Sequence, residues 1–599
     1  MNILSYVYNS KTGTMKTRNT RIYLLLILIL LCIPACRKSG IESISIIETT
    51  DLHGVIFPWD YIENKPLDVS LAGTATYLKK LKSQKDAIFL LDNGDNLQGQ
   101  PAVYYYNFID TVSPHFLSEA MNWMGYDACT VGNHDIEAGH AVYDRLKGEY
   151  RFPLLAANAV DTETGKPYFK PYIILEKDKI RIAVLGLVTP AIPTWLPEEL
   201  YSGIEFRDMV ETALIWMPEI LSQKPDLVVG LFHSGWSTLD EEYKLDVSMN
   251  ENGASAVAWK VPGFDIIFCG HDHRTANEKF VNIQGDTVLI LNGGSRSEFI
   301  ARADINFSPG KKIKKISGEL VEIKDFAPDP EFLDRFESQD KTIKEYVARV
   351  IGNSTEKITS RDSYFGSSAF TDFIHSIQLE ITGADISFAA PLSFDVEIAK
   401  GPVTVGDMFN LYRYENKLYT ISLTGEEVLK YLEYSYSEWI NTMKGIDDFL
   451  LKYRLDKNGR PVMNNGKAWL ANASYNFDSG AGIFYTVDVS KPEGNRINIS
   501  SFTDGRPFEK QKSYKVAVSS FRGNGGGGHL TRGAGIKQEE LRRRLISSTD
   551  RDLRYYILKT IEKKKILNPE PLGNWKFIPE KWVKVRIPGE YLLLFGTTK

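Results

Sequence analysis

Short apolar runs alternate with stretches of helical periodicity from Ile44 to about Phe307. Such alternation predicts a layered α/β domain in which strands and helices follow one another. Strands are expected at residues 44–47, 88–91, 128–131, 180–188, 227–231, 266–269 and 287–291. Helices are expected at residues 71–81, 115–124 and 209–221. We place this first domain at residues 41–326.

The second half of the chain predicts a connecting helix and another α/β domain. Ala327-Pro-Asp-Pro330 is a helix-start signal, and apolar residues then recur on one helical face, so we interpret residues 327–352 as a linker helix. A surface helix within a single domain is the alternative. Within a second domain at 353–547 we expect a helix at 370–381, a strand, turn and helix over 403–411, and strands at 385–389, 419–423 and 514–519. Residues 548–599, with a helix at 553–563 and several late aromatic residues, predict an extension packed on the body.

Polar residues of metal-binding type follow the C-terminal ends of five apolar runs in the first domain. A lone histidine at a strand end is more often structural, but ligands of α/β sheets collect at the carboxyl ends of strands, so repetition of the pattern favours one shared site. The mixed carboxylate, imidazole and amide set suits zinc, manganese, iron or cobalt better than magnesium or calcium. The candidate ligands are Asp51, His53, Asp95, Asn133, His233, His271 and His273.

These residue types predict a site for two divalent ions. Two ions about 3.5–4 Å apart form a clamp for in-line displacement at phosphorus, and the carboxylate of Asp95 can bridge them. We interpret His134 as a catalytic group that stabilises developing charge and protonates the departing oxygen. Glu137 is placed to orient the His134 imidazole, although a solvated acid in the first turn of a helix is the alternative.

Together the sequences Asp-x-His, Gly-Asp, Gly-Asn-His-Asp, His-x-Gly and Gly-His-x-His resemble those of the calcineurin-like metallophosphoesterases. The two-domain layout resembles their 5′-nucleotidase branch over nearly all of the mature chain. The resemblance implies an α/β fold, α+β overall: a four-layer β-sandwich flanked by helices, then a C-terminal nucleotide-binding domain. It assigns Asp51, His53, Asp95 and His273 to one ion, and Asp95, Asn133, His233 and His271 to the other. His134 matches the catalytic histidine, and Glu137 stands where the 5′-nucleotidases have an aspartate.

Features of the second domain resemble the bacterial 2′,3′-cyclic-nucleotide 2′-phosphodiesterase/3′-nucleotidases more than the 5′-nucleotidases. Phe388-Ala-Ala-Pro391 replaces a glycine-rich segment that ends in arginine, and Gly527 replaces an aspartate that would contact the ribose. Tyr414 and Phe521 match the aromatic residues that sandwich the base. We add Asn416, Gly525 and Gly527 to the predicted substrate-binding residues.

A run of four glycines, residues 525–528, follows an apolar strand and Phe521. We expect it to bring the backbone close to a ligand, because glycine lacks a Cβ atom. A flexible connector is the alternative.

The resemblance implies hydrolysis of 2′,3′-cyclic nucleotides to 3′-nucleotides, and then to nucleosides and phosphate. A 5′-nucleotidase or UDP-sugar hydrolase with the same metals is the close alternative. A surface lipoprotein that binds nucleotides without catalysis is a third, which the full ligand set and His134 argue against. The formal net charge of −5 gives no basic field for a nucleic-acid polymer. The expected partners are nucleotide small molecules, and the expected state is a monomer.

The N-terminus carries a signal-like segment, which we place at residues 1–40. Lys16, Arg18 and Arg21 precede an apolar stretch at 22–33, which is short for a transmembrane span. Ile33-Pro-Ala-Cys36 then resembles a bacterial lipoprotein signal, with Cys36 as the lipidated residue. We expect export to the periplasm or cell envelope with a lipid anchor; a secretory signal and a buried helix are the alternatives. Cys129 and Cys269 lie in apolar strands, which favours two buried free thiols over a disulfide.

Overall fold

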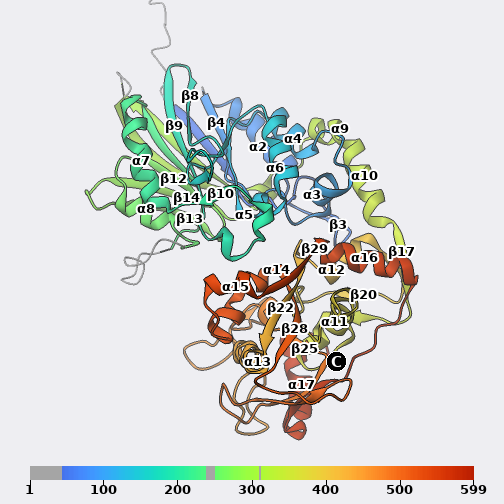
Figure 1. The fold of residues 1–599 in the computed structure, drawn as a ribbon. Helices are drawn as coiled ribbons and strands as arrows, with labels where there is room; N and C mark the ends of the chain where they lie inside the picture. Colours follow the sequence, from blue (N-terminus) through green and yellow to red (C-terminus); the bar gives the residue numbers. More distant parts are fainter. Residues whose placement is uncertain (1–42, 86, 238–249, 309–311, 599) are drawn as a thin grey trace, which may run out of the picture.

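The computed structural model describes residues 43–85, 87–237, 250–308 and 312–598. It shows two domains joined by α9 (Pro330–Arg335) and α10 (Glu337–Ala348) (Figure 1). The signal-like segment with Cys36 lies outside the described residues. Among the helices within the described ranges, none has the length and apolar character needed to cross a membrane.

The first domain is built on two six-stranded sheets, as far as its described residues show. Each has a parallel centre that the predicted apolar runs supply. The first sheet has antiparallel strands at one edge, and the second has an antiparallel strand at both edges. The first sheet has the order β16 (Lys312–Glu322), β15 (Phe299–Ser308), β1 (Ser43–Thr49), β4 (Ala87–Asp92), β5 (Ala128–Thr130), β6 (Leu154–Leu155). The second has the order β13 (Thr275–Val281), β14 (Thr287–Gly293), β12 (Ile266–Cys269), β11 (Leu227–His233), β9 (Ile180–Val188), β8 (Tyr172–Lys177).

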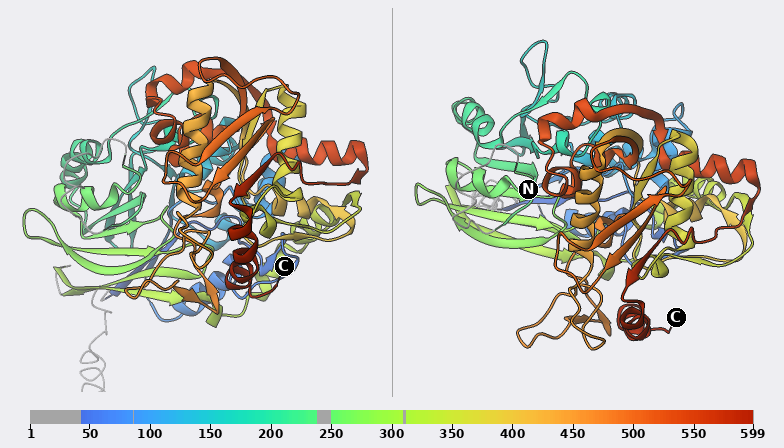
Figure 2. Two further views of the ribbon diagram at one scale, coloured as in Figure 1. Left: turned by 90° about the horizontal axis from the view of Figure 1, so that it is seen from below. Right: turned by 60° about the horizontal axis from the view of Figure 1, so that its bottom comes forward.

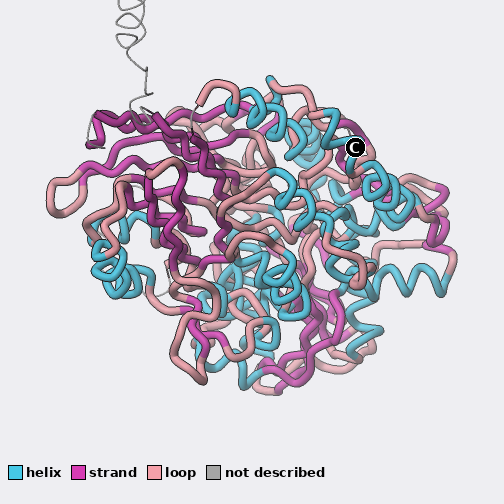
Figure 3. Tube along the Cα trace, turned by 90° about the horizontal axis from the view of Figure 1, so that it is seen from above, coloured by secondary structure: helices cyan, strands magenta, loops and turns pink. Residues whose placement is uncertain are grey.

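The two sheets pack face to face, and helices cover their outer faces (Figures 1 and 3). Side chains such as Ile46, Phe89, Val184 and Phe268 fill the space between the sheets. The helices on the outside of the first sheet are α2 (Leu71–Lys82), α4 (Phe116–Met124) and α6 (His140–Glu149), and those outside the second are α7 (Met209–Ser222) and α8 (Ala254–Lys260). This arrangement confirms the expected four layers.

Burial on both faces explains why the central strands are almost uninterrupted apolar runs, since a polar residue on either face would lose its contact with water.

Local capping fixes the helix starts. The Ser70 hydroxyl accepts from the Gly73 amide at 3.2 Å to begin α2, and Asp208 caps α7 in the same way at 2.8 Å. Cys129 and Cys269 are buried free thiols, which confirms that prediction.

The second domain is organised around a five-stranded sheet. Its strand order is β25 (Ser479–Ala481), β19 (Ile386–Ala389), β28 (Ser513–Ser519), β22 (Lys417–Thr424), β29 (Leu545–Asp552). One face carries α11 (Ala369–Thr382), α12 (Val405–Leu411) and α16 (Leu553–Lys564), and the other carries α13 (Gly425–Trp439). These elements match the predicted strands and helices of this domain.

The linker differs from the single helix predicted at residues 327–352. Phe336 leaves the helical conformation (φ −108°, ψ 16°) and buries its ring against Phe332, with centroids 4.9 Å apart, so the segment splits into α9 and α10. The helix ends at Ala348, and Ile351 belongs to β17 (Val350–Ser354), which pairs with β21 (Gly401–Thr404).

The C-terminal extension packs on the second domain, as expected, and it also contributes strands to that domain. The predicted boundary at residue 547 falls inside β29, which pairs with β22 and completes the sheet. Further along, β31 (Trp575–Ile578) pairs with β26 (Ile483–Asp488), and α17 (Glu580–Phe595) follows it. Figure 2 shows these red segments running across the domain.

Candidate active site

All seven predicted metal ligands meet at one edge of the sandwich, beyond the ends of β1, β4, β5, β11 and β12. Six of them form two groups of three, and within each group the ligand atoms lie within 4.8 Å of one another. One group is Asp51, His53 and His273, and the other is Asp95, His233 and His271. Asn133 joins the second group, because its Oδ1 lies 2.8 Å from His271 Nδ1 and 3.2 Å from His233 Nε2.

The atoms of the first group converge on one point. The Nε2 atoms of His53 and His273 are 3.0 Å apart, and they lie 4.0 Å and 3.4 Å from Asp51 Oδ1. The other ring nitrogen of His53 lies 3.0 Å from the carbonyl of Gln98, which turns Nε2 towards its neighbours. Nitrogen and oxygen lone pairs facing one another in this way require a shared proton or a cation. The donor set therefore fits a divalent ion.

Five of the seven predicted ligands have backbone in the left-handed region, at φ between 46° and 74°. They are Asp51, His53, Asp95, His271 and His273. Residues other than glycine rarely adopt this conformation, which costs on the order of 1–3 kcal/mol each and clusters at functional sites. The turns after β1, β4 and β12 thus hold these five ligands in a conformation that only the surrounding structure stabilises.

Asp95 is the centre of the site. Its Oδ2 lies 3.2 Å from His233 Nε2, and its Oδ1 accepts from the His134 amide at 2.7 Å. Burial raises the pKa of Asp95, but the positive charges of His233 and His134 lower it well below its usual value. A Cβ atom on Gly132 would lie 2.1 Å from Asp95 Oδ1, so only glycine allows this approach.

His134 is oriented by Glu137, one turn further along α5 (Asn133–Glu137). Their Nδ1 and Oε2 atoms are 2.5 Å apart, and both residues line the central cavity. Burial lowers the pKa of His134, but the charges of Asp95 and Glu137 outweigh it and raise the pKa to about 10. A protonated imidazole with its Nδ1 occupied has Nε2–H available as a donor.

Asp135, to which sequence reasoning assigned no role, fastens two ligand loops together. Its carboxylate accepts from the amides of Asp95, Asn96, Leu97 and Gly132 at 2.8–3.1 Å. It is the third residue of α5, where a carboxylate commonly caps a helix. The place of Asp135 in the first turn of a helix was the signal that the sequence offered for a capping role. It could not show the bonds to residues 95–97, because these residues belong to another loop.

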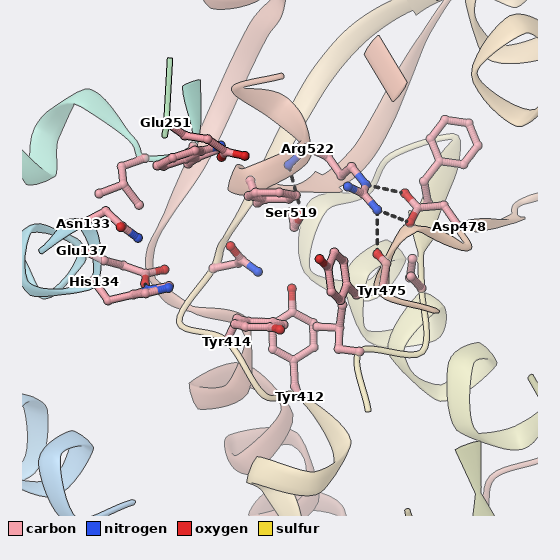
Figure 4. A pocket seen from close by; sticks show the side chains of 18 of the residues that line it. Asn133, His134, Glu137, Glu251, Tyr412, Tyr414, Tyr475, Asp478, Ser519 and Arg522 are labelled. Atoms are coloured by element: carbon pink, nitrogen blue, oxygen red, sulfur yellow. Dashed lines mark hydrogen bonds and ion pairs between the residues drawn. The ribbon is translucent and has the colours of Figure 1, made fainter. Parts of the chain in front are cut away.

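A cavity of about 420 Å³ lies between the metal-ligand edge and the second domain. His134, Glu137 and Glu251 lie on one side of it, and Tyr414 and Tyr412 on the other (Figure 4). Asn416 and Phe521 also line it, as predicted. Two lining residues that sequence reasoning missed are Glu251 and Trp195, whose ring stacks on that of His271 with centroids 5.4 Å apart.

The glycine run lies behind the cavity wall and does not reach the cavity. The wall includes neither Gly525 nor Gly527. Instead, the run folds into a compact turn, in which a Cβ atom on Gly526 would lie 2.6 Å from the Phe521 ring. One on Gly527 would lie 2.2 Å from Arg522 Nη1. The close approach that the glycines permit is therefore to side chains of the wall, not to a ligand, which corrects the prediction.

Arg522 is a buried part of the wall that sequence reasoning did not single out. Its guanidinium donates two hydrogen bonds of 3.0 Å to the Asp478 carboxylate (Figure 4) and one of 3.1 Å to the Gly526 carbonyl. Bidentate pairing of this kind fixes both side chains. Arg522 thus joins α14 (Ser520–Gly523), which carries Phe521, to the loop that carries Tyr475 and Asp478.

Comparison with known proteins agrees with this geometry. Residues 44–275 match the calcineurin-like phosphoesterase family, and residues 350–532 match the C-terminal domain of 5′-nucleotidases. The chain is 27% identical, over 90% of its length, to the trifunctional nucleotide phosphoesterase protein YfkN of Bacillus subtilis, but spans only 39% of that longer protein. It is 26% identical to a 2′,3′-cyclic-nucleotide 2′-phosphodiesterase/3′-nucleotidase of Haemophilus influenzae, covering 90% of this chain and 88% of that one.

Among solved structures, a putative 5′-nucleotidase from Staphylococcus aureus has the same fold, with a TM-score of 0.73 at 20% identity over 90% of this chain and all of that one. The family implies divalent metal ions, and the described residues supply two groups able to hold them. The chain therefore belongs to the calcineurin-like metal-dependent phosphoesterases in which a 5′-nucleotidase C-terminal domain follows the metal-binding domain.

Proposed function

We propose that this protein hydrolyses 2′,3′-cyclic nucleotides to 3′-nucleotides and then releases phosphate to give nucleosides. One observation carries the proposal: a single cavity has metal ligands and His134 on one side and the aromatic residues Tyr414 and Phe521 on the other. Phosphate and base would thus be held by different domains. Relatives named as 2′,3′-cyclic-nucleotide 2′-phosphodiesterase/3′-nucleotidase support the choice of substrate.

The residues present fit two divalent ions, of zinc, manganese, iron or cobalt. Asp51, His53 and His273 would hold one, and Asn133, His233 and His271 the other, with Asp95 between them. Such ions polarise the phosphoryl oxygens and lower the pKa of water.

His134 would act on the departing oxygen of the ester. Its Nδ1 is held by Glu137, so Nε2 is the atom that donates a proton or hydrogen bond as negative charge develops. The backbone amide of His134 is bound to Asp95, which fixes the imidazole relative to the metal ligands.

The aromatic residues of the second domain would hold the base by stacking. Stacking is worth about 1–3 kcal/mol per base and tolerates any base. Gly527 lies outside the cavity wall, so this position provides no contact that would favour the ribose of a 5′-nucleotide. We therefore expect little base preference and no dependence on a 5′-phosphate.

Comparing phosphate release from 2′,3′-cyclic AMP, 3′-AMP and 5′-AMP tests the proposed function. We expect both of the first two to be cleaved, with a higher kcat/KM for 3′-AMP than for 5′-AMP. A marked preference for 5′-AMP would assign the chain to 5′-nucleotide chemistry instead. Metal-dependent binding without turnover of any ester would leave only a nucleotide-binding role.

Replacing Phe521 by alanine should weaken nucleotide hydrolysis far more than hydrolysis of bis-p-nitrophenyl phosphate. The base-free ester needs only the metal-ligand side of the cavity, whereas the nucleotide loses about 1–3 kcal/mol of stacking. Steady-state kcat/KM on both substrates measures this. Phe508→Ala is a matched control, because Phe508 is a partly buried aromatic of the same domain that is not in the cavity wall. An equal loss on both substrates would show that Phe521 supports the fold.

We also propose that the protein is exported to the periplasm or cell envelope as a monomer anchored through a lipid on Cys36. The basic residues, the apolar stretch and the Ile33-Pro-Ala-Cys36 sequence support this proposal. Cys36→Ser should block lipidation, so that precursor accumulates or protein appears in the soluble fraction. Metabolic lipid labelling with membrane fractionation measures both; labelling equal to that of the parent chain would exclude Cys36 as the anchor.

A further inference from the structure

Arg554 is a fully enclosed cation in the C-terminal extension, 1% exposed, at the start of α16. Its guanidinium lies 4.0 Å from the ring centroid of Phe409 and 4.9 Å from that of Tyr104. Tyr104 belongs to α3 (Pro101–Tyr104) of the first domain, so this cation lies where the two domains meet. Burying a guanidinium costs several kcal/mol unless its donors are satisfied.

The three side-chain hydrogen bonds that the structure gives Arg554 go to one loop, residues 412–416. Nε donates to the Tyr412 carbonyl at 2.8 Å, Nη1 donates to Glu415 Oε1 at 2.8 Å, and Nη2 donates to the Arg413 carbonyl. The amide of the preceding Leu553 donates to the Asn416 carbonyl at 2.8 Å. The neighbours of Tyr414 on both sides are therefore held, and Tyr414 lies between them in the cavity wall (Figure 4).

The same end of α16 is bonded to the first domain. Tyr104 Oη donates to Asp552 Oδ2 at 3.1 Å, and Asp552 in turn caps α16 by accepting from the Tyr555 amide at 3.1 Å. The chain from Tyr104 through Asp552 and Arg554 thus connects the metal-binding domain to the loop that carries Tyr414. Lysine could replace the charge of Arg554 but not its planar, forked geometry.

We propose that Arg554 is a positioning residue that sets Tyr414 at the distance from the metal ligands that a nucleoside phosphate requires. The inference rests on the proposed nucleotide specificity for its substrate, and on the contacts above for its mechanism. Arg554 does not touch the cavity itself and acts through the backbone of residues 412–416.

Inhibition of base-free ester hydrolysis by adenosine tests the proposal without depending on nucleotide turnover. With bis-p-nitrophenyl phosphate as substrate, Arg554→Met should raise the inhibition constant of adenosine about tenfold or more while kcat/KM for the ester stays within about twofold. KM for the nucleotide should rise with little change in kcat. Arg554→Lys should lie between Arg554→Met and the parent protein, and it supplies the measurement should the methionine variant fail to fold.

Arg551→Met is the matched control, because Arg551 lies three positions earlier, is exposed, and has its guanidinium 5.8 Å from the ring centroid of Tyr555. The proposal is overturned if Arg554→Met changes the adenosine constant no more than Arg551→Met does, or if ester hydrolysis falls equally, which would indicate a structural role. It is also overturned if adenosine fails to inhibit the parent protein. A parent protein that cleaves no nucleotide yet is inhibited by adenosine would refute the proposed function, and the comparison of variants would still decide the role of Arg554.

Discussion

Asp95→Asn is expected to lose nearly all phosphoesterase activity and at least one bound metal ion per chain. A carboxylate can give one oxygen to each of two cations, whereas a neutral amide offers a single oxygen and no charge. Asp95 Oδ2 contacts His233 of the second ligand group at 3.2 Å, and in the proposed arrangement Asp95 would also hold the ion of the first group. Metal content of the purified variant, measured beside activity, separates loss of ions from loss of chemistry.

Asp92→Asn provides the matched control for this substitution. Asp92 is as deeply buried as Asp95 and lies on the same chain segment, but it accepts from Thr49 at 2.6 Å and from the Gly94 amide at 3.0 Å and belongs to neither ligand group. Burial raises the pKa of Asp92. We expect this variant to keep its ions. Two ions per chain in Asp95→Asn, as in the parent protein, would refute the bridging role.

The metal ligands could be predicted from sequence because each follows directly on a buried strand. Apolar runs such as residues 227–231 and 266–269 fix where strands end, and parallel strands bring their ends to one edge. The ligand types then identify the site. Tyr414 and Phe521 could be placed in the cavity only through family resemblance, because nothing in their local pattern distinguishes them from core aromatics.

Contacts between segments far apart in the chain could not be predicted. The bonds of Asp135 to residues 95–97, of Arg522 to Asp478, and of Arg554 to residues 412–413 each join elements whose relative position only the folded chain defines. The glycine run was misread for a related reason: an unusual backbone conformation is predictable from glycine, but the group that approaches it is not. Strand β29 crossed a predicted boundary because its polar residues, on an edge strand, lack the apolar alternation of a strand.

His134→Asn is expected to lower kcat by roughly 10²–10⁴-fold while both metal ions stay bound, which is the usual range for a lost acid or charge-stabilising group. His134 lies outside both ligand groups. The other described histidines outside these groups have partners elsewhere: His140 is bonded to Asp144, and His115, His375 and His529 are buried and hydrogen-bonded. Its side chain contacts Glu137 rather than a ligand carboxylate, so its removal leaves each ligand group intact. The His134 amide bond to Asp95 is also retained, because asparagine keeps the backbone donor.

Glu137→Gln distinguishes orientation from proton donation. If Glu137 holds the imidazole so that Nε2 faces the ester, the amide should retain a hydrogen bond to Nδ1 but lose the charge that stabilises the protonated ring, and kcat should fall by less than in His134→Asn. An ester with a good leaving group, such as a p-nitrophenyl ester, needs little protonation of the departing oxygen. Both variants should therefore be impaired less on that ester than on a nucleotide, at unchanged metal content. Loss of metal from His134→Asn would show that His134 is a ligand, and an equal loss on both esters would show that it does not act on the leaving group.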